Sequence, residues 1–435
     1  MTDIDAALPR RIPLNPIDHF LLQLDGSMRQ RGLANVCTFA VTLEGRLERD
    51  MLQRRLERDA VYRWLARLRL VRRPFGYSRW QWRRDARLPA IQAHTLDEGA
   101  PVPPSLVAPP LDVGREPPLK IDLLHLGGRL SRLVFTWHHA LMDAHGGEFL
   151  VSWLGGHLQA RPLPWQPPGR CGLSLRERGE IARGMKTALY EASKPPFLAL
   201  HRPDAPAGAL HYRVLRFSSR QSECIRERAR SHGAGVLASA FHLAAVAGAL
   251  AELQRQRGGE PADALVPVPQ DLRRRGAAGP LVGNQVSFLF YRIPAAALND
   301  LARCTGVLSA QAQAFIRSGM AAYYATMMGL LQRLPAPWYR ALLRSPTQGL
   351  MSTCSFSDTG EMLPGCQALF GLPLLDACHY PPNVHPPGLT FVFSRFRGAL
   401  RISFAWMDGV IAAGEADLLP AGLKRRLLGD ETGRL

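Results

Sequence analysis

The chain has 435 residues, of which 46% are hydrophobic and 21% are charged. This composition excludes wholesale disorder, and the length predicts two or three domains rather than one small core. The formal net charge is +18, but the Arg residues that dominate it are spread through predicted helices. We therefore expect no nucleic-acid binding, and two interpretations of the basic charge stay open. It is an ordinary solvated face, or it attracts an anion such as a coenzyme A phosphate, an acidic carrier protein or an anionic lipid head group.

Cysteine usage and hydropathy bear on the cellular compartment. The seven cysteines are scattered and none forms a CxxC pair, which predicts reduced thiols and neither a disulfide framework nor structural zinc. Residues 1–11 begin with acids and lack the apolar core of a secretory signal. The uncharged run 233–251 is mostly Ala and Gly, which predicts a buried helix rather than a membrane span. We expect a protein in the cytoplasm or peripheral to the inner face of the membrane.

The first half of the chain predicts strands and helices in alternation. Strands are indicated by continuous apolar runs, and amphipathic helices by apolar residues three and four apart. Gly127-Gly128 between two strand-like runs indicates a hairpin. The predicted order is strand 36–43, helix 47–56, a Pro-rich loop over 89–118, strands 119–126 and 130–138, and a helix over 149–158.

Two Pro-rich stretches, 160–172 and 195–206, flank a weakly helical segment and predict a crossover between domains. Beyond it the pattern restarts with a strand, a helix capped by Ser219, an Ala-rich helix and further strands. The strands of this second half are predicted at 212–217, 264–268, 285–293, 389–396 and 400–406. We therefore predict an α/β protein of two related lobes, with an N-terminal lobe over 1–165, a linker over 166–210 and a C-terminal lobe over 211–435.

The most informative segment is 136–145, which contains three His and one Asp where a strand ends. Side chains alternate along a strand, so the adjacent His138 and His139 cannot both face one pocket while the strand stays regular. Asp143 follows on the turn into the next helix, where it could pair with a cation.

Three interpretations of these residues stay open on the sequence alone. An imidazole titrates near working pH, so it could remove a proton from an alcohol or amine that then attacks a thioester carbonyl. A histidine at a strand end can also be ordinary hydrogen-bonded packing. A metal site is the third interpretation, since His138, His139, Asp143 and His145 are all ligand types, although divergence of the two adjacent imidazoles weakens it.

The spacing His138-His139-xxx-Asp143 resembles the HHxxxDG signature of the acyltransferase superfamily that includes chloramphenicol acetyltransferase and nonribosomal peptide condensation domains. Within it, the chain looks most similar to bacterial wax ester synthase/diacylglycerol acyltransferase-type proteins over most of its length. Further segments that resemble this family, in the same order, are 14–21, 266–273, 283–287 with Ile293-Pro294, 357–360 and the final hairpin 389–406.

The resemblance implies a fold of two chloramphenicol-acetyltransferase-like lobes with an active-site channel between them. It implies that His139 is the general base, and that Asp143 is structural and pairs with Arg273. His138 and Gly146 would complete the motif, and Asn284, Ser287 and Ser357 would line the channel, Ser357 as a possible oxyanion donor. The acyl group would pass directly from acyl-CoA or an acyl carrier protein to a hydroxyl group, without a metal, a permanently bound cofactor or a covalent enzyme intermediate.

Two positions depart from the family pattern. Ala144 stands where Gly usually follows the motif Asp, and Asp358 stands where Asn is usual. These departures keep open a non-catalytic binding protein that retains the fold. A glycerolipid acyltransferase is a further alternative, because His138 and Asp143 also satisfy an HxxxxD spacing.

Overall fold

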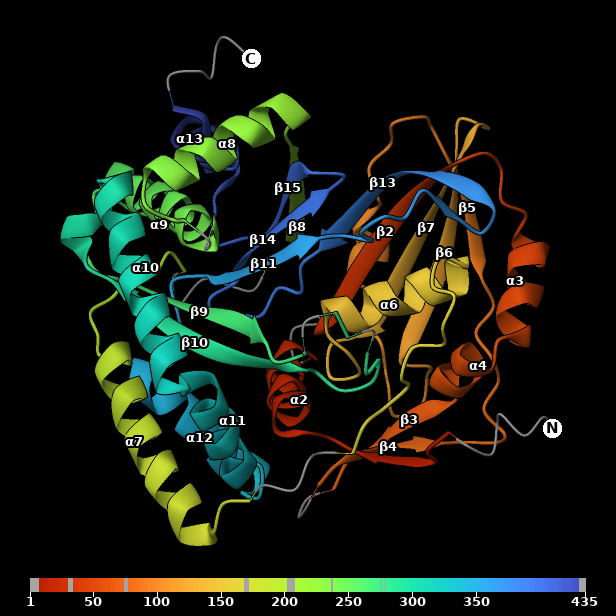
Figure 1. Ribbon diagram of the computed structural model, residues 1–435, viewed down its shortest axis with the longest axis horizontal. Helices are drawn as coiled ribbons and strands as arrows, with labels where there is room; N and C mark the ends of the chain where they lie inside the picture. The colour runs from red at the N-terminus through yellow and green to blue at the C-terminus, as the bar shows by residue number, and fades with distance from the viewer. Residues whose placement is uncertain are drawn as a thin grey trace.

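The computed structural model describes residues 8–29, 34–73, 77–167, 172–201, 208–235, 238–274, 276–277 and 279–429. Cys171 and parts of the predicted linker therefore lie outside the described residues, as does the start of the predicted N-terminal segment. The described chain forms two halves that lie side by side, each with a sheet and covering helices (Figure 1). The predicted α/β class is confirmed.

The first half is built on a sheet with the strand order β12-β13-β2-β7-β6-β5. Its strands are β2 (Val36–Glu44), β5 (Gln92–Leu96), β6 (Leu119–Leu126), β7 (Leu130–His138), β12 (Ala368–Leu369) and β13 (Leu372–Tyr380). The hairpin of β6 and β7 has the predicted bounds, and Gly127 and Gly128 make its turn with positive φ angles that favour glycine. Residues 89–118, predicted as a loop, contain β5 and the short helix α5 (Pro104–Val107).

Strand β13 does not follow the predicted division into lobes. It comes from the range assigned to the C-terminal lobe, yet it pairs antiparallel with β2 of the first half, with Cys378 opposite Ala40. Such pairing between segments more than 300 residues apart leaves no local trace in the sequence. The boundaries 165 and 210 stay a prediction, but residues 368–380 belong by pairing to the sheet of the first half.

Helices cover this sheet and set the position of the histidine motif. Helix α6 (Ala144–Gly155) follows β7 after a short loop that contains His139 and Asp143, and it lies across one face of the sheet (Figure 1). The remaining elements of this half are β1 (Arg11–Pro13), α2 (Pro16–Arg29), α3 (Arg49–Arg58), α4 (Ala60–Ala66), β3 (Leu68–Val71) and β4 (Arg79–Trp82). Leu52 and Leu56 of α3 are buried as their spacing predicts, whereas Met51 is half exposed.

The second half contains a sheet with the order β11-β14-β15-β8 and a separate hairpin of β9 and β10. The strands are β8 (Leu210–Arg216), β9 (Ala264–Asp271), β10 (Val286–Ile293), β11 (Ser355–Glu361), β14 (Leu389–Phe396) and β15 (Ala399–Met407). Helices α8 (Ser219–Ser231), α9 (Ala238–Gln256) and α13 (Leu418–Leu428) pack with this sheet in one core. Helix α8 is capped by Ser218, which accepts a hydrogen bond from the Gln221 N–H, and not by Ser219 as predicted.

The Ala-rich segment forms the buried helix that its composition predicts, as α9 over 238–256. In the described part of the chain, no helix combines the length and apolar character needed to cross a bilayer. Four further helices lie together on one side of the second half: α7 (Leu175–Ser193), α10 (Leu301–Ser318), α11 (Met320–Leu331) and α12 (Ala336–Arg344) (Figure 1). Of these, only α7 falls in a segment predicted as helical.

Candidate active site

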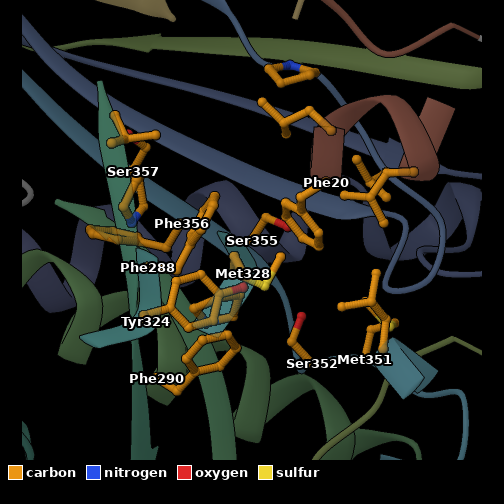
Figure 2. Close-up of a pocket in the computed structure, with 18 of the residues that line it drawn as sticks. Phe20, Phe288, Phe290, Tyr324, Met328, Met351, Ser352, Ser355, Phe356 and Ser357 are labelled. Carbon is orange, nitrogen blue, oxygen red and sulfur yellow. The ribbon is translucent and has the colours of Figure 1, made fainter. Parts of the chain in front are cut away.

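A cavity of about 590 Å³ lies between the two halves. The first half contributes α2, the loop after β7, the start of α6 and the end of β13 to its wall, and the second contributes β9, β10, β11, β14, α7, α11 and α12. One arm of the cavity is aromatic and aliphatic, with Phe288, Phe290, Tyr324 and Met328 grouped together (Figure 2). Phe20 of α2 packs edge-on against Phe288, with the ring centroids 5.6 Å apart (Figure 2). This arm excludes most polar groups and suits a lipophilic chain.

His139 lies at the polar end of the cavity, immediately after β7. Its main chain is held from two sides: its N–H donates to the Asn35 carbonyl at 2.9 Å, and its carbonyl accepts from Asn284 Nδ2 at 2.7 Å. The ring Nδ1 is buried without a hydrogen bond of good geometry among the described residues. The backbone is thus fixed while the ring borders the cavity.

The adjacent His138 is turned into the protein. Its side chain is fully buried, its Nδ1 accepts a hydrogen bond from the Ala140 N–H at 3.1 Å, and its Nε2 is 3.4 Å from Asp25 Oδ1. The structure therefore separates the two imidazoles, as strand alternation predicts. His139 borders the cavity, and His138 braces the end of β7 against α2.

Burial sets the protonation state of His139. Desolvation lowers the pKa of this imidazole below its ordinary value, while its own carbonyl, Asp143 and Asn284 oppose the shift. Because desolvation dominates, the ring is neutral at neutral pH. A neutral imidazole can accept a proton from a bound hydroxyl group.

Asp143 is fully engaged in structure. It caps α6 by accepting from the Gly146 N–H, and it accepts two hydrogen bonds from Arg273 at 2.8 and 2.9 Å. The Gln285 N–H donates to the same carboxylate at 2.8 Å. The side chains of both members of the Asp143–Arg273 pair are less than 10% exposed. The pairing expected from the resemblance is present, and it joins the start of α6 to the loop after β9.

Glycine residues allow α6 to start close to its neighbours. A Cβ atom at Gly146 would lie 2.6 Å from the Leu281 carbonyl oxygen, and one at Gly147 would overlap the Trp137 ring. Ala144, where the family has Gly, is the first residue of α6 and does not have a positive φ. This departure therefore introduces no backbone strain.

Asn284 supports His139 from behind and does not line the cavity as predicted. Its main-chain N–H and its Nδ2 both donate to Asp18 Oδ1 at 2.8 Å, and Nδ2 also donates to the His139 carbonyl. Asp18 is buried, and desolvation raises the pKa of its carboxyl group to about 7. Asp18 is a site residue that motif reasoning missed, although it lies in the segment 14–21 that carries the resemblance.

The prediction that Ser287 lines the channel is wrong. Its hydroxyl donates to the Ala321 carbonyl at 2.6 Å, and the residue is fully buried. Side chains alternate along β10, so Val286, Phe288 and Phe290 border the cavity while Ser287 faces the opposite side.

Ser357 does border the cavity, on β11. Its neighbour Asp358 also borders the cavity and accepts a hydrogen bond from His242 Nδ1 at 2.8 Å. The bond from His242, together with Arg395, outweighs desolvation and lowers the pKa of the Asp358 carboxyl group. Asp358, which stands where the family usually has Asn, is thus paired with the buried His242.

A second group of titratable side chains lies at the cavity, and of these only His145 was singled out by the sequence. His379 Nε2 is 2.7 Å from Glu148 Oε1, and His145 lies between Glu148 and Asp271 at 4.0 and 3.8 Å. The pair of His379 with Glu148 ties β13 to α6. Across the described residues, no three His, Cys, Asp or Glu side chains come together as a metal-binding group.

Comparison with known proteins agrees with this architecture. No protein-family model and no curated protein sequence matches the chain. Solved structures do match: the trichothecene 15-O-acetyltransferase TRI3 from Fusarium sporotrichioides has a TM-score of 0.70 at 11% identity, with 96% of each chain covered. The first condensation domain of the CDA synthetase has a TM-score of 0.65 at 17% identity, with 96% of this chain and 95% of that chain covered. Polyketide synthase associated protein 5 from Mycobacterium tuberculosis has a TM-score of 0.60 at 17% identity, with 97% and 99% covered.

These structures share the fold of two chloramphenicol-acetyltransferase-like lobes, so the predicted architecture is confirmed. The group includes an acetyltransferase and condensation domains. At these identities the likeness concerns the fold, and the choice of substrates rests on the residues of this chain.

Proposed function

We propose that the protein is an acyltransferase that moves an acyl group from a thioester to a hydroxyl group, with His139 as the general base. The observation that carries the proposal is a neutral imidazole at the polar end of a largely apolar cavity between two lobes. The Asn284 bonds to Asp18 and to the His139 carbonyl, and the Asp143–Arg273 pair, hold the main chain that carries that imidazole.

The proposed reaction has two steps. The accessible ring nitrogen of His139 takes the proton of the acceptor hydroxyl group while its oxygen forms a bond to the thioester carbonyl carbon. The resulting oxyanion then collapses, the C–S bond breaks, and the protonated His139 returns the proton to the leaving thiolate. Ser357 is the candidate donor to the oxyanion, because it borders the cavity and its hydroxyl group can donate a hydrogen bond.

The apolar arm supports a lipophilic substrate. Phe288, Phe290 and Tyr324 form much of its wall, and such a surface binds an alkyl chain mainly through the removal of apolar area from water. We therefore extend the proposal to a long-chain acyl group or a long-chain alcohol, as in wax ester synthase or diacylglycerol acyltransferase-type chemistry. The donor would be acyl-CoA or an acyl carrier protein.

The test is turnover by purified protein with acyl-CoA donors of increasing chain length and long-chain alcohols. We expect His139→Gln to lower kcat by about 10²–10⁴-fold, the usual contribution of a general base. The matched control is His145→Gln, which removes a second imidazole from the same wall and should leave most of the turnover. Unchanged turnover in folded His139→Gln would refute the mechanism, and wild-type protein that binds donors without turnover would favour the non-catalytic alternative.

A further inference from the structure

The wall of the cavity reaches the surface of the protein at α7 and α12. Most cavity-lining residues are at least partly buried, but Arg183, Lys186 and Tyr190 on α7 are exposed. Leu342 on α12 and Ser345 just after it are also exposed lining residues. The 3₁₀ turn that follows α12 packs against α7, so these residues surround one mouth.

Helix α12 presents apolar side chains on both its inner and its outer face. Tyr339 is 1% exposed and packs edge-on against His19 of α2, which fixes the inner face. Trp338 is 70% exposed and Leu342 is 43% exposed, and their i, i+4 spacing places them on one outward stripe. A surface helix normally places polar residues on that side, so an outward Trp and Leu beside a cavity mouth indicate a binding surface.

The chain segment that carries this stripe has charge of a single sign. Residues 301–357, which include α10, α11 and α12, contain five Arg and no Asp, Glu or Lys. Two of these Arg residues, Arg340 and Arg344, are on α12, and Arg183 and Lys186 add positive charge from α7. The acidic Glu191, next to Tyr190 on α7, is paired with Lys194. A surface that is cationic over this length complements an anionic partner.

We propose that this mouth docks on an anionic lipid surface. The rim is defined as Arg183, Lys186, Tyr190, Trp338 and Leu342. Trp and Tyr side chains favour the boundary between head groups and acyl chains, while Arg and Lys attract anionic head groups. A docked rim opens the apolar arm directly to the acyl layer, so a lipophilic substrate enters without crossing water. Binding of an acidic carrier protein would account for the Arg and Lys side chains of the rim but not for the exposed Trp338.

The inference concerns the outer surface and is tested apart from the chemistry at His139. Full-length protein is floated with vesicles of phosphatidylcholine alone or of phosphatidylcholine mixed with phosphatidylglycerol. We expect binding to the anionic vesicles that weakens with added salt, and equal binding by His139→Gln. Failure to bind anionic vesicles, or binding only to an acidic carrier protein, would overturn the proposal while leaving the acyltransferase assignment intact.

Matched variants distinguish the rim from the general positive charge of the protein. Trp338→Ser combined with Leu342→Ser should weaken vesicle binding about tenfold or more, and Lys186→Glu about fivefold. The controls are Leu418→Ser and Lys424→Glu on α13, where Leu418 is 48% exposed and Lys424 is also exposed. Equal losses from the α13 controls, or no loss from the rim variants, would mean that the rim is not the docking surface.

Discussion

At the scale of single residues, His139 combines a fixed main chain with a desolvated ring. Burial lowers the pKa of its imidazole, and a base must be neutral to act. Activity should therefore be present above this lowered pKa and be lost as the pH falls through it. We expect the acidic limb of kcat/KM against pH to have its midpoint below about 6.5, the ordinary value for histidine.

The measurement is kcat/KM across the acidic range for the wild type and for His145→Gln. The limb should persist in the variant, because it reports His139 and not the neighbouring imidazole. A midpoint above the ordinary histidine value, or loss of the limb in His145→Gln, would contradict the assignment of the base.

The pair of Asp143 and Arg273 should contribute mainly to stability and positioning. Arg273→Ala leaves the Asp143 carboxylate buried without its two strongest donors, so we expect the free energy of unfolding to fall by about 3–5 kcal/mol. Arg273→Lys keeps the charge but cannot reproduce the two parallel hydrogen bonds, and should lie between Arg273→Ala and the wild type. Urea unfolding measures both. The exposed neighbour Arg274 is the control, and Arg274→Ala should leave the free energy of unfolding unchanged.

At the scale of elements, the start of α6 depends on Gly146 and Gly147, because neighbouring parts of the fold lie too close to these residues to leave room for a side chain. Gly147→Ala would push a methyl group into the Trp137 ring, and we expect a loss of about 1–3 kcal/mol in the free energy of unfolding. Gly179→Ala on α7 is the matched control, because a Cβ there would meet nothing within 4 Å. That variant should gain about 0.5–1 kcal/mol from helix propensity. Equal effects of the two substitutions in thermal or urea unfolding would contradict the close contact of α6 with β7.

The elements that the sequence predicts well are those with a strong local pattern. Strands β6, β7, β14 and β15 are apolar runs joined by tight turns, and their observed bounds are within about two residues of the predicted ones. Strand β11, SFSDTGE, is polar, and helix α11, MAAYYATMMGLL, is apolar on nearly every side. Neither has a clear period, so local pattern does not reveal them.

The residues of the candidate site also divide into those that a local sequence pattern reveals and those that it does not. The neighbours His139 and Asp143 lie within one short motif, so their proximity follows from the sequence. Asp18 and Asn284 are 266 residues apart and meet only in the folded chain. The wrong prediction for Ser287 has a different cause. Side chains alternate along β10, so Ser287 and Phe288 point to opposite faces of the strand, and this alternation is visible in the sequence as it is for β7.

At the scale of the whole molecule, β13 connects the two halves by strand pairing. The strand leaves the second half, pairs with β2 from Thr38 to Leu43, and returns to β14. His379 on β13 is paired with Glu148 of α6 in a buried contact, which fastens the crossing strand to the half that it enters. The cavity lies between the two halves, so its shape depends on this connection.

We therefore expect urea unfolding to be a single transition, with Trp fluorescence and far-ultraviolet circular dichroism changing together. The eight Trp residues include Trp80 and Trp137 in the first half and Trp406 in the second, so fluorescence reports both halves. Glu148→Gln weakens the contact with His379 that holds β13 against α6. We expect it to lower the urea midpoint, while unfolding still occurs in a single transition. Two separate transitions in the wild type would show that the halves unfold independently, and would remove β13 as the element that couples them.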